Sequence, residues 1–263
     1  MTTSPLPLEA VCAVILAAGE GSRMKSDIPK PLHEVCGTSM VMHVVHSLES
    51  IPLVATVVVV GYRASEVTAH VQQHAPEWAR IRFATQHEQN GTGDAAAVGL
   101  TGLTTDDHTD ATAVLVMPGD TPLLTSHTIK QLLTEHTASK SAATVLTAVL
   151  DDPTGYGRIV RDATGNVVRI VEHRDASPDE LNIREINTGI YLFALNVFGL
   201  ALKRIGTNNS QSEYYLTDVV AVLASSGHSV GSVIAPASET AGVNDPQQLA
   251  EAEREMLRRN ATH

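Results

Sequence analysis

The chain has 263 residues, a length that fits one large α/β domain or two small ones. Hydrophobic residues make up 43% of it and aromatic residues only 3%, so aliphatic side chains must fill a core of ample size. The formal net charge of −11 argues against a protein that wraps nucleic acid, because phosphate contacts require clustered Lys and Arg.

The first part of the chain alternates between short apolar runs and helical patterns. We expect strands at 11–17, 54–60, 81–85 and 112–117, and helices at 40–48, 64–74, 92–100 and 128–136. Four consecutive valines at 57–60 are typical of a parallel strand that helices cover on both faces. The alternation predicts an α/β fold with a Rossmann-like, doubly wound, mostly parallel sheet. Ligands bind beyond the carboxyl ends of the strands in such sheets.

The pattern changes after residue 147. Strands are expected at 156–161 and 166–172, joined by a turn at 162–165, and again at 188–194 and 230–234. Helices are expected at 195–205, 216–224 and 247–259. Because no Pro- or Ser-rich linker divides the chain, we expect one domain over 1–263, with a first half at about 10–147, a second half at about 148–245 and a terminal helix at 246–263.

Two features of the sequence indicate the cellular compartment of the protein. Cys12 and Cys36 form no Cys-x-x-Cys pair and no disulfide framework, which suits a reducing cytosol. The apolar run at 11–18 is too short to span a bilayer, and Glu9 stands where a leader peptide needs basic residues. We therefore expect a soluble cytoplasmic protein with no membrane partner.

The first motif follows the first predicted strand and reads LAAGEGSRM at 16–24, continuing to PKPLH at 29–33. Small residues after a strand let backbone N–H groups approach a ligand and cradle phosphate oxygens. Arg23 and Lys30 add positive charge to the same segment. Met24 stands where a dinucleotide fingerprint needs its third glycine, and Pro31 follows Lys30 where a Walker A loop needs Ser or Thr. A bare Gly-x-Gly would favour an ordinary turn, but the full run is more specific.

That run closely resembles the signature of the sugar nucleotidylyltransferases. Later motifs narrow the resemblance to the N-acetylglucosamine-1-phosphate uridylyltransferases of bacterial cell-wall precursor synthesis, over about residues 14–244. These motifs are QHEQNGTG at 86–93, GDTPL at 119–123, DDPTGYGRI at 151–159, VEH at 171–173, EINTG at 185–189, EYYLTD at 213–218 and GVN at 242–244. Together, and in this order, they are highly specific.

The resemblance implies a sheet of the nucleotide-diphospho-sugar transferase type, with UTP in the first half and N-acetylglucosamine-1-phosphate in the second. It implies transfer of UMP to the sugar phosphate with release of pyrophosphate, Mg²⁺ as cofactor, and UTP binding first. By matching positions it gives nucleotide binding to Leu16, Ala17, Ala18, Gly19, Gln86, Gly91 and Thr92; catalysis to Arg23, Lys30 and Asp120; sugar-phosphate binding to Gly157, Glu172 and Asn187; and Mg²⁺ to Asp120 and Asn244.

Several of these residues also have a purely structural interpretation. Thr92 suits the cap of an Ala-rich helix, Asp120 suits a turn, and Asn244 suits the cap of the terminal helix. Glu172 is equally suited to a surface salt bridge. Asp94 stands where the family usually has His, so its role stays open at this point.

Two rival functions stay in view. The nearest is a related transferase with another sugar or nucleotide. The other is a non-catalytic protein that binds a nucleotide sugar, and it would be expected to have lost Arg23, Lys30, Asp120 or Asn244.

The family's domain usually precedes a left-handed β-helix that acetylates glucosamine-1-phosphate. The chain ends at His263 and shows no hexapeptide repeats, so that second activity is not expected from it. A truncated chain and a stand-alone enzyme both stay open, as does the oligomeric state.

Overall fold

The fold is taken from a computed structural model that describes residues 9–261, so the last two positions of the expected terminal segment lie outside the described residues. The strands are β1 Val11–Ala17, β2 Glu34–Val35, β3 Thr38–Ser39, β4 Leu53–Val60, β5 Ile81–Thr85, β6 Ala113–Pro118, β7 Ala143–Val149, β8 Arg158–Arg161, β9 Val167–Val171, β10 Glu185–Ala194 and β11 Val230–Ile234.

The α-helices are α1 Met40–Ser47, α2 Ala64–His74, α3 Thr92–Thr101, α4 Thr105–Asp110, α5 Ser126–Ser139, α6 Pro178–Leu181, α7 Leu195–Leu202, α8 Asp218–Ser225, α9 Ala237–Thr240 and α10 Pro246–Asn260. Short 3₁₀ turns are η1 Ser22–Met24, η2 Lys30–Leu32 and η3 Glu77–Ala79. Within residues 9–261, no helix combines the length and the apolar character needed to cross a membrane.

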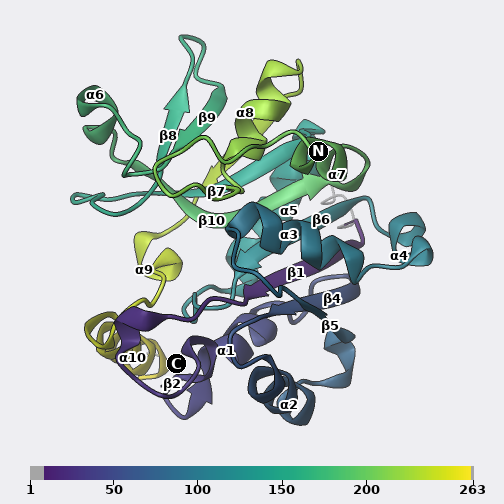
Figure 1. The fold of residues 1–263 in the computed structure, drawn as a ribbon, viewed down its shortest axis with the longest axis vertical. Coiled ribbons are helices and arrows are strands. Elements are labelled where there is room, and N and C mark those ends of the chain that lie inside the picture. The colour runs from purple at the N-terminus through teal and green to yellow at the C-terminus, as the bar shows by residue number, and fades with distance from the viewer. Residues whose placement is uncertain (1–8, 262–263) are drawn as a thin grey trace, which may run out of the picture.

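One sheet runs through the molecule in the order β11-β7-β10-β6-β1-β4-β5, and β8 and β9 branch from β10 (Figure 1). β1 pairs in parallel with both β4 and β6, β4 pairs in parallel with β5, and β11 pairs in parallel with β7. β10 is antiparallel to its neighbours β6 and β7. The predicted α/β fold with a mixed, mostly parallel sheet is therefore confirmed, and the chain reverses its direction of winding between β1 and β6.

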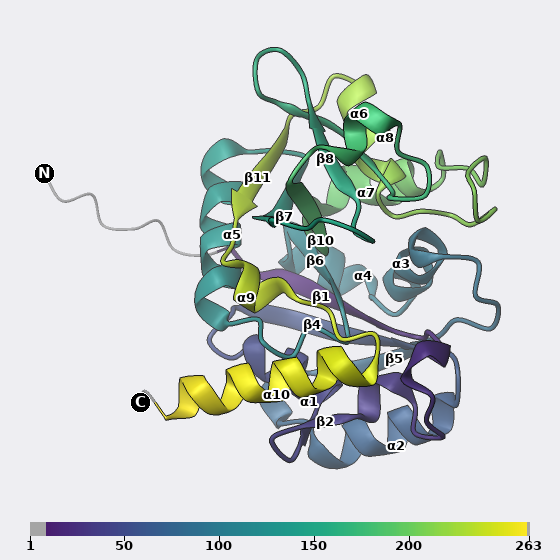
Figure 2. The same cartoon turned by 90° about the vertical axis from the view of Figure 1, so that its left-hand side faces the viewer.

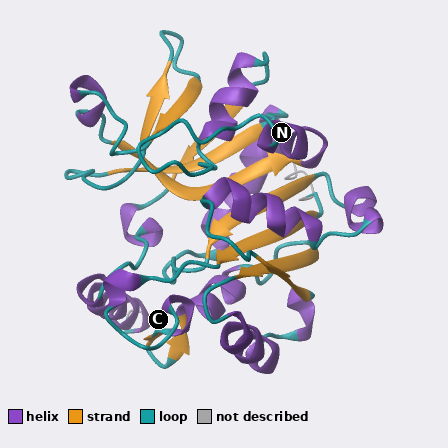
Figure 3. Cartoon of the chain, in the orientation of Figure 1, coloured by secondary structure: helices purple, strands orange, loops and turns teal. Residues whose placement is uncertain are grey.

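The strands of the sheet bury both faces. Cys12 and Val14 of β1 belong to a core shared with α3, α7 and α8, whereas Ala13 and Ile15 belong to a core shared with α1, α2 and α5. Alternate residues of a strand point to opposite faces, so this division follows from pleating. Figure 2 shows α5 on one side of the strands and α3 on the other, and Figure 3 shows helices outside a central layer of strands.

The register of the parallel strands aligns their carboxyl ends. Ala17 lies opposite Val60, Val60 lies opposite Thr85, and Leu16 lies opposite Pro118. The loops that leave β1, β5 and β6 therefore start from one edge of the sheet, as the order of elements predicts. This edge carries the motifs that the sequence singles out.

Most elements of the first half lie where the sequence predicts them, and β1, α2 and β5 have the predicted bounds. β7 was missed, because its buried threonine and alanine positions weaken the apolar signal. The expected division at about residue 147 falls inside this strand. The strand predicted from Tyr156 begins at Arg158, and the helix predicted to reach Ile205 ends at Leu202.

A capping box fixes the short helix α4, which follows α3 and leads into β6. The side chain of Thr104 accepts a hydrogen bond from the backbone N–H of Asp107, while the Asp107 carboxylate accepts from the N–H of Thr104. Asp107 is buried and forms an ion pair with Arg82 of β5. The hydrogen bond from Arg82 lowers the pKa of Asp107 from its ordinary 3.8 to about 2.

We predict that Asp107→Asn lowers the free energy of unfolding at pH 7 by about 1–2 kcal/mol. The loss stays this small because the side chain of Arg82 is partly exposed, so solvent screens its charge. The pKa of Asp107 is lowered in the folded state, so its stabilisation is present above about pH 4 and is lost as the pH falls towards about 2. Urea denaturation at pH 7 and at pH 3 should show a gap between the two proteins that narrows on acidification. The exposed neighbour Asp106→Asn is the control, and a gap that does not change with pH would contradict the prediction.

Candidate active site

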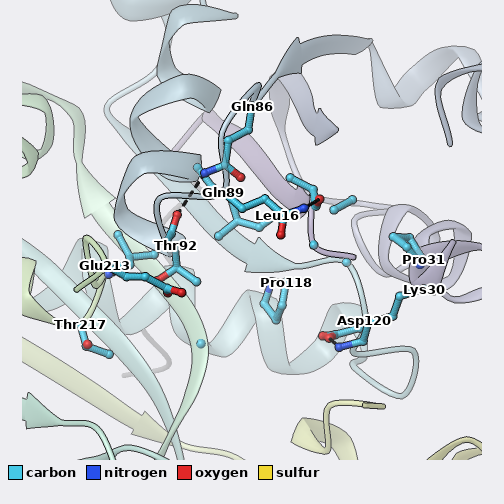
Figure 4. Close-up of a pocket in the computed structure, with 18 of the residues that line it drawn as sticks. Leu16, Lys30, Pro31, Gln86, Gln89, Thr92, Pro118, Asp120, Glu213 and Thr217 are labelled. Carbon is cyan, nitrogen blue, oxygen red and sulfur yellow. Dashed lines mark hydrogen bonds and ion pairs between the residues drawn. The ribbon is translucent and has the colours of Figure 1, made fainter. Parts of the chain in front are cut away.

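A cavity of about 370 Å³ opens at the carboxyl ends of β1, β5 and β6. Figure 4 shows side chains from the three loops and from the second half of the chain around it. Its wall is made of Leu16, Ala17, Ala18, Gly19, Lys30, Pro31, Gln86, Gln89, Gly91, Thr92, Ala95, Pro118, Gly119, Asp120, Glu172, Asn187, Gly189, Tyr191, Glu213, Leu216 and Thr217. Eleven of the predicted site residues line the cavity, and Arg23, Gly157 and Asn244 lie beside it.

In the loop after β1, Lys30 packs against one glycine, Gly21. Gly21 has φ +69°, in the left-handed region, and a Cβ on it would stand 2.5 Å from Cβ of Lys30. A side chain at this position is therefore excluded both by the backbone conformation and by the packing of Lys30. Arg23 and Lys30 lie on the short turns η1 and η2, so the loop is folded rather than extended.

Four side chains distant in sequence meet at the edge of the cavity. The ammonium of Lys30 forms an ion pair with the Asp120 carboxylate and donates to Oδ1 of Asn244 at 2.8 Å. The guanidinium of Arg23 donates to the same Asn244 oxygen at 2.9 Å. Lys30 and Asn244 are 214 positions apart, so only the tertiary fold brings them together.

The chain returns to this edge through a backbone contact. The N–H of Val243 donates to the carbonyl of Asp120 at 2.9 Å, which fixes the segment before α10 against the loop after β6. Asp245 is the N-cap of α10, because its side chain accepts from the N–H of Gln248. Asn244 is therefore not the helix cap, and its amide oxygen is directed to Lys30 and Arg23.

The Asp120 and Asn244 oxygens fit a divalent cation. Both converge on one positive group, the Lys30 ammonium, and carboxylate and amide oxygens are ligands that Mg²⁺ accepts. Within residues 9–261, no group of three or more His, Cys, Asp or Glu side chains has the arrangement of a metal site. The two oxygens of the chain thus fit an ion that keeps most of its shell for water and phosphate.

Polar groups gather at the turn between β5 and α3. Gln86 is 6% exposed, and its Nε2 donates to the carbonyl of Gly91 at 3.2 Å and to Oδ2 of Asp94 at 2.7 Å. Gly91 has φ +106° and is the N-cap of α3, without a side-chain cap. Thr92 does not cap the helix, since its hydroxyl accepts the N–H of Leu216 at 3.1 Å. Thr92 thereby joins the start of α3 to the segment that precedes α8.

The second half contributes a carboxylate and an amide. Glu172 follows β9, and Thr217 donates to its Oε1 at 3.0 Å. Burial raises the pKa of Glu172, and the Thr217 hydrogen bond opposes that rise. Asn187 of β10 donates its backbone N–H to the carbonyl of Gly157 at 2.9 Å. A Cβ on Gly157 would lie 3.5 Å from Oε2 of Glu172, so the three residues form one cluster.

Sequence reasoning missed several residues of the wall. Gly189 and Tyr191 stand two and four positions from Asn187 in β10, so the period of a strand would have placed them on the same side. Thr217 lies within the quoted motif at 213–218, but a lone threonine carries no signal of its own. Thr188 lies between Asn187 and Gly189 but does not line the cavity, and its hydroxyl donates to the carbonyl of Leu146.

Comparisons with known proteins show which family the chain resembles. The family model described as nucleotidyl transferase matches residues 12–256. The bifunctional protein GlmU of Streptomyces avermitilis is 49% identical over 249 residues, which cover 94% of this chain and 50% of that protein. The bifunctional protein GlmU of Clostridium botulinum is 43% identical over 243 residues, covering 92% of this chain and 51% of that protein. The chain thus spans about half the length of the curated relatives it matches.

The fold also has a counterpart among solved structures. A UDP-glucose pyrophosphorylase complexed with UDP-glucose superimposes with a TM-score of 0.74 over 95% of this chain and 99% of that one, at 15% sequence identity. At that identity the likeness supports the fold alone. The family model covers almost all of the described sheet and every loop that borders the cavity. The chain therefore belongs to the nucleotidyl transferase family.

Proposed function

We propose that this chain transfers UMP from UTP to N-acetylglucosamine-1-phosphate, giving UDP-N-acetylglucosamine and pyrophosphate. The observation that carries the proposal is the cavity bordered by the glycine-rich loop, by the Gln86–Thr92 turn and by Glu172 and Asn187. A site of this shape can hold a nucleotide and a sugar phosphate side by side. The likeness to the GlmU proteins, which reaches 49% identity, supports the choice of these two substrates.

The reaction needs no covalent intermediate with the protein. A phosphate oxygen of the sugar phosphate attacks the α-phosphorus of UTP, a new P–O bond forms, and the bond to pyrophosphate breaks. The task of the protein is to align two anions that repel each other. The backbone from Leu16 to Gly19 would cradle the triphosphate, and Arg23 would balance the charge of the departing pyrophosphate.

Asp120 and Asn244 are the residues that would hold Mg²⁺, and their oxygens already share one cationic partner in Lys30. When bound, the ion neutralises phosphate charge and restricts the geometry of the reacting groups. Lys30 has a flexible four-carbon stem, so its ammonium can move from the two oxygens to a phosphate group. The proposal includes a cytoplasmic location, because the reaction consumes a nucleoside triphosphate.

A pyrophosphate-release assay with UTP tests the proposed substrates, using N-acetylglucosamine-1-phosphate, glucosamine-1-phosphate and glucose-1-phosphate. We predict at least about a tenfold preference in kcat/KM for the acetylated sugar, on the order of what one unpaired buried polar group costs. Glu172 and Asn187 would lose a partner when the acetamido group is missing. Equal values of kcat/KM for the acetylated and the free amino sugar would sink the assignment of the sugar.

Replacing Asp120 with alanine should nearly abolish transfer while leaving the melting temperature close to that of the parent chain. Its side chain is partly exposed and its carboxylate contacts Lys30 rather than a helix end, so the loss of stability is small. Asn244→Ala should raise the Mg²⁺ concentration needed for half-maximal rate. The matched control is Asp245→Ala, which removes the cap of α10 and should cost about 1 kcal/mol of stability with activity per folded molecule retained. Full activity in a stable Asp120→Ala protein would show the assignment to be wrong.

Lys30→Ala is expected to lower kcat by roughly 10²–10³, with a smaller effect on UTP affinity, because a cation aimed at developing charge acts mainly in the transition state. Steady-state kinetics and calorimetric binding of UTP measure the two effects separately. The control is Lys203→Ala, which removes an exposed lysine at the end of α7. An unchanged kcat with a raised KM would assign Lys30 to ground-state binding instead.

A further inference from the structure

Among the described residues, hydrogen-bond partners hold only the NH₂ group of the Gln86 side-chain amide. Its Nε2 lies between two oxygens, the Gly91 carbonyl at 3.2 Å and Oδ2 of Asp94 at 2.7 Å. Asp94 is in the first turn of α3, and Gln86 directly follows β5. Gln86 is 6% exposed and lines the cavity, so its amide is not free to rotate in solvent.

The chemistry of the two partners fixes which end of the amide faces them. A backbone carbonyl and a carboxylate only accept hydrogen bonds, so the group between them must be the NH₂ and not the oxygen. Both protons of Nε2 are thereby used by the protein. The Oε1 atom faces away from these partners and accepts no hydrogen bond from any described residue. Figure 4 shows the Gln86 oxygen on the side away from the turn at Thr92.

Of the two contacts, the one to Asp94 contributes more to holding the Gln86 amide in this orientation. The Gly91 carbonyl is the longer contact, and it is shared with the N–H of Ala95 at 3.1 Å. Hydrogen bonds to ionised groups are stronger than those between neutral groups. Without Asp94, the amide would keep only a shared neutral acceptor on that side.

We propose that Asp94 is a positioning residue for base selection, because it locks the Gln86 amide so that only a hydrogen-bond acceptor faces the cavity. This inference rests on the proposed function. Uracil carries a proton on N3 and can donate to Oε1. Cytosine has an unprotonated N3, so its lone pair would meet the lone pairs of Oε1. A site that offers an acceptor therefore favours uracil and disfavours cytosine.

The test is Asp94→Asn, which keeps the size of the side chain but removes its charge. A neutral amide oxygen holds the NH₂ of Gln86 less strongly than a carboxylate does, so the Gln86 side chain can turn more readily and present its own NH₂ to the cavity. We expect the preference for UTP over CTP to fall by about tenfold, the order of the difference between a hydrogen bond to a charged group and one to a neutral group. The preference is measured twice: as the ratio of kcat/KM values, and as the ratio of Kd values from calorimetry without sugar phosphate.

Glu88→Gln is the matched control, because it removes a nearby exposed carboxylate that contacts Asn90 and not Gln86. Its ratio of UTP to CTP should equal that of the parent chain. A uniform loss of both affinities in Asp94→Asn, or an equal change of the ratio in Glu88→Gln, would overturn the inference. Thermal melting shows whether the variant is folded, and Asp94→Ser, which also abolishes the carboxylate, serves if it is not.

Measurements on the parent chain distinguish a failure of this inference from a failure of the proposed function on which it rests. If the parent binds UTP and rejects CTP while Asp94→Asn keeps the same ratio, the inference alone fails. If the parent binds neither nucleotide, the proposed function fails with it. If the parent binds UTP and CTP equally, the proposal that Asp94 fixes the Gln86 amide for base selection fails, while a nucleotide-binding site remains in place.

Discussion

The site depends on the parallel pairing of β1 with two neighbours that the chain visits in opposite directions. From β1 the chain moves to β4 and β5 on one side, and it later returns to add β6 on the other. The loops after β1 and β6 therefore diverge, and the gap between them is the crevice in which open α/β sheets bind ligands. Because the register places Leu16 opposite Pro118, the glycine-rich loop and Asp120 leave the sheet at the same level. The rest of the cavity is built upon that alignment.

The second half of the chain completes the site by two connections of different kinds. The hydrogen bond between Thr92 and Leu216 joins the start of α3 to the segment that carries Thr217, whose hydroxyl donates to Glu172. The bond from Val243 to Asp120 returns the end of the chain to the edge of the sheet. The first connection joins two residues of the cavity wall. The second supplies Asn244, and the cap at Asp245 fixes where α10 begins. These hydrogen bonds add to the pairing of β10 with β6 and β7, which already joins the second half of the chain to the sheet.

The sequence predicts the parallel part of this architecture well, because apolar runs and glycine-rich turns mark it directly. β1, α2, β5 and β11 have the expected bounds, whereas β7 was missed because its threonine and alanine positions weaken the apolar signal. In the fold its two threonines are buried against His136 and Glu185. The division of the chain into two halves and the roles of the site residues stay predictions. The order of the motifs in the chain identified most of the segments that line the cavity. It could not indicate that Asn244 is paired with Lys30 or that Asp94 holds Gln86, because those contacts are made across the fold.

The charged residues in the cavity wall are few, and most are carboxylates. Small residues and uncharged amides make up most of the wall, and its charged members are Lys30, Asp120, Glu172 and Glu213. Under the proposed function, the site would balance two anions with Lys30, Arg23 and the Mg²⁺ that Asp120 and Asn244 would hold. Its cations have partners: Lys30 is compensated by Asp120, and Arg23 donates to the neutral Asn244 oxygen. The ion pair with Asp120 offsets the positive charge of Lys30 in the ligand-free site, and the Asn244 oxygen remains as an acceptor for Lys30 when Asp120 is replaced. Under the proposed function, a nucleotide would compete with Asp120 for the ammonium of Lys30. Mg²⁺ held by Asp120 and Asn244 would occupy the oxygens that Lys30 contacts in the ligand-free site, which would leave the ammonium free to contact a phosphate group.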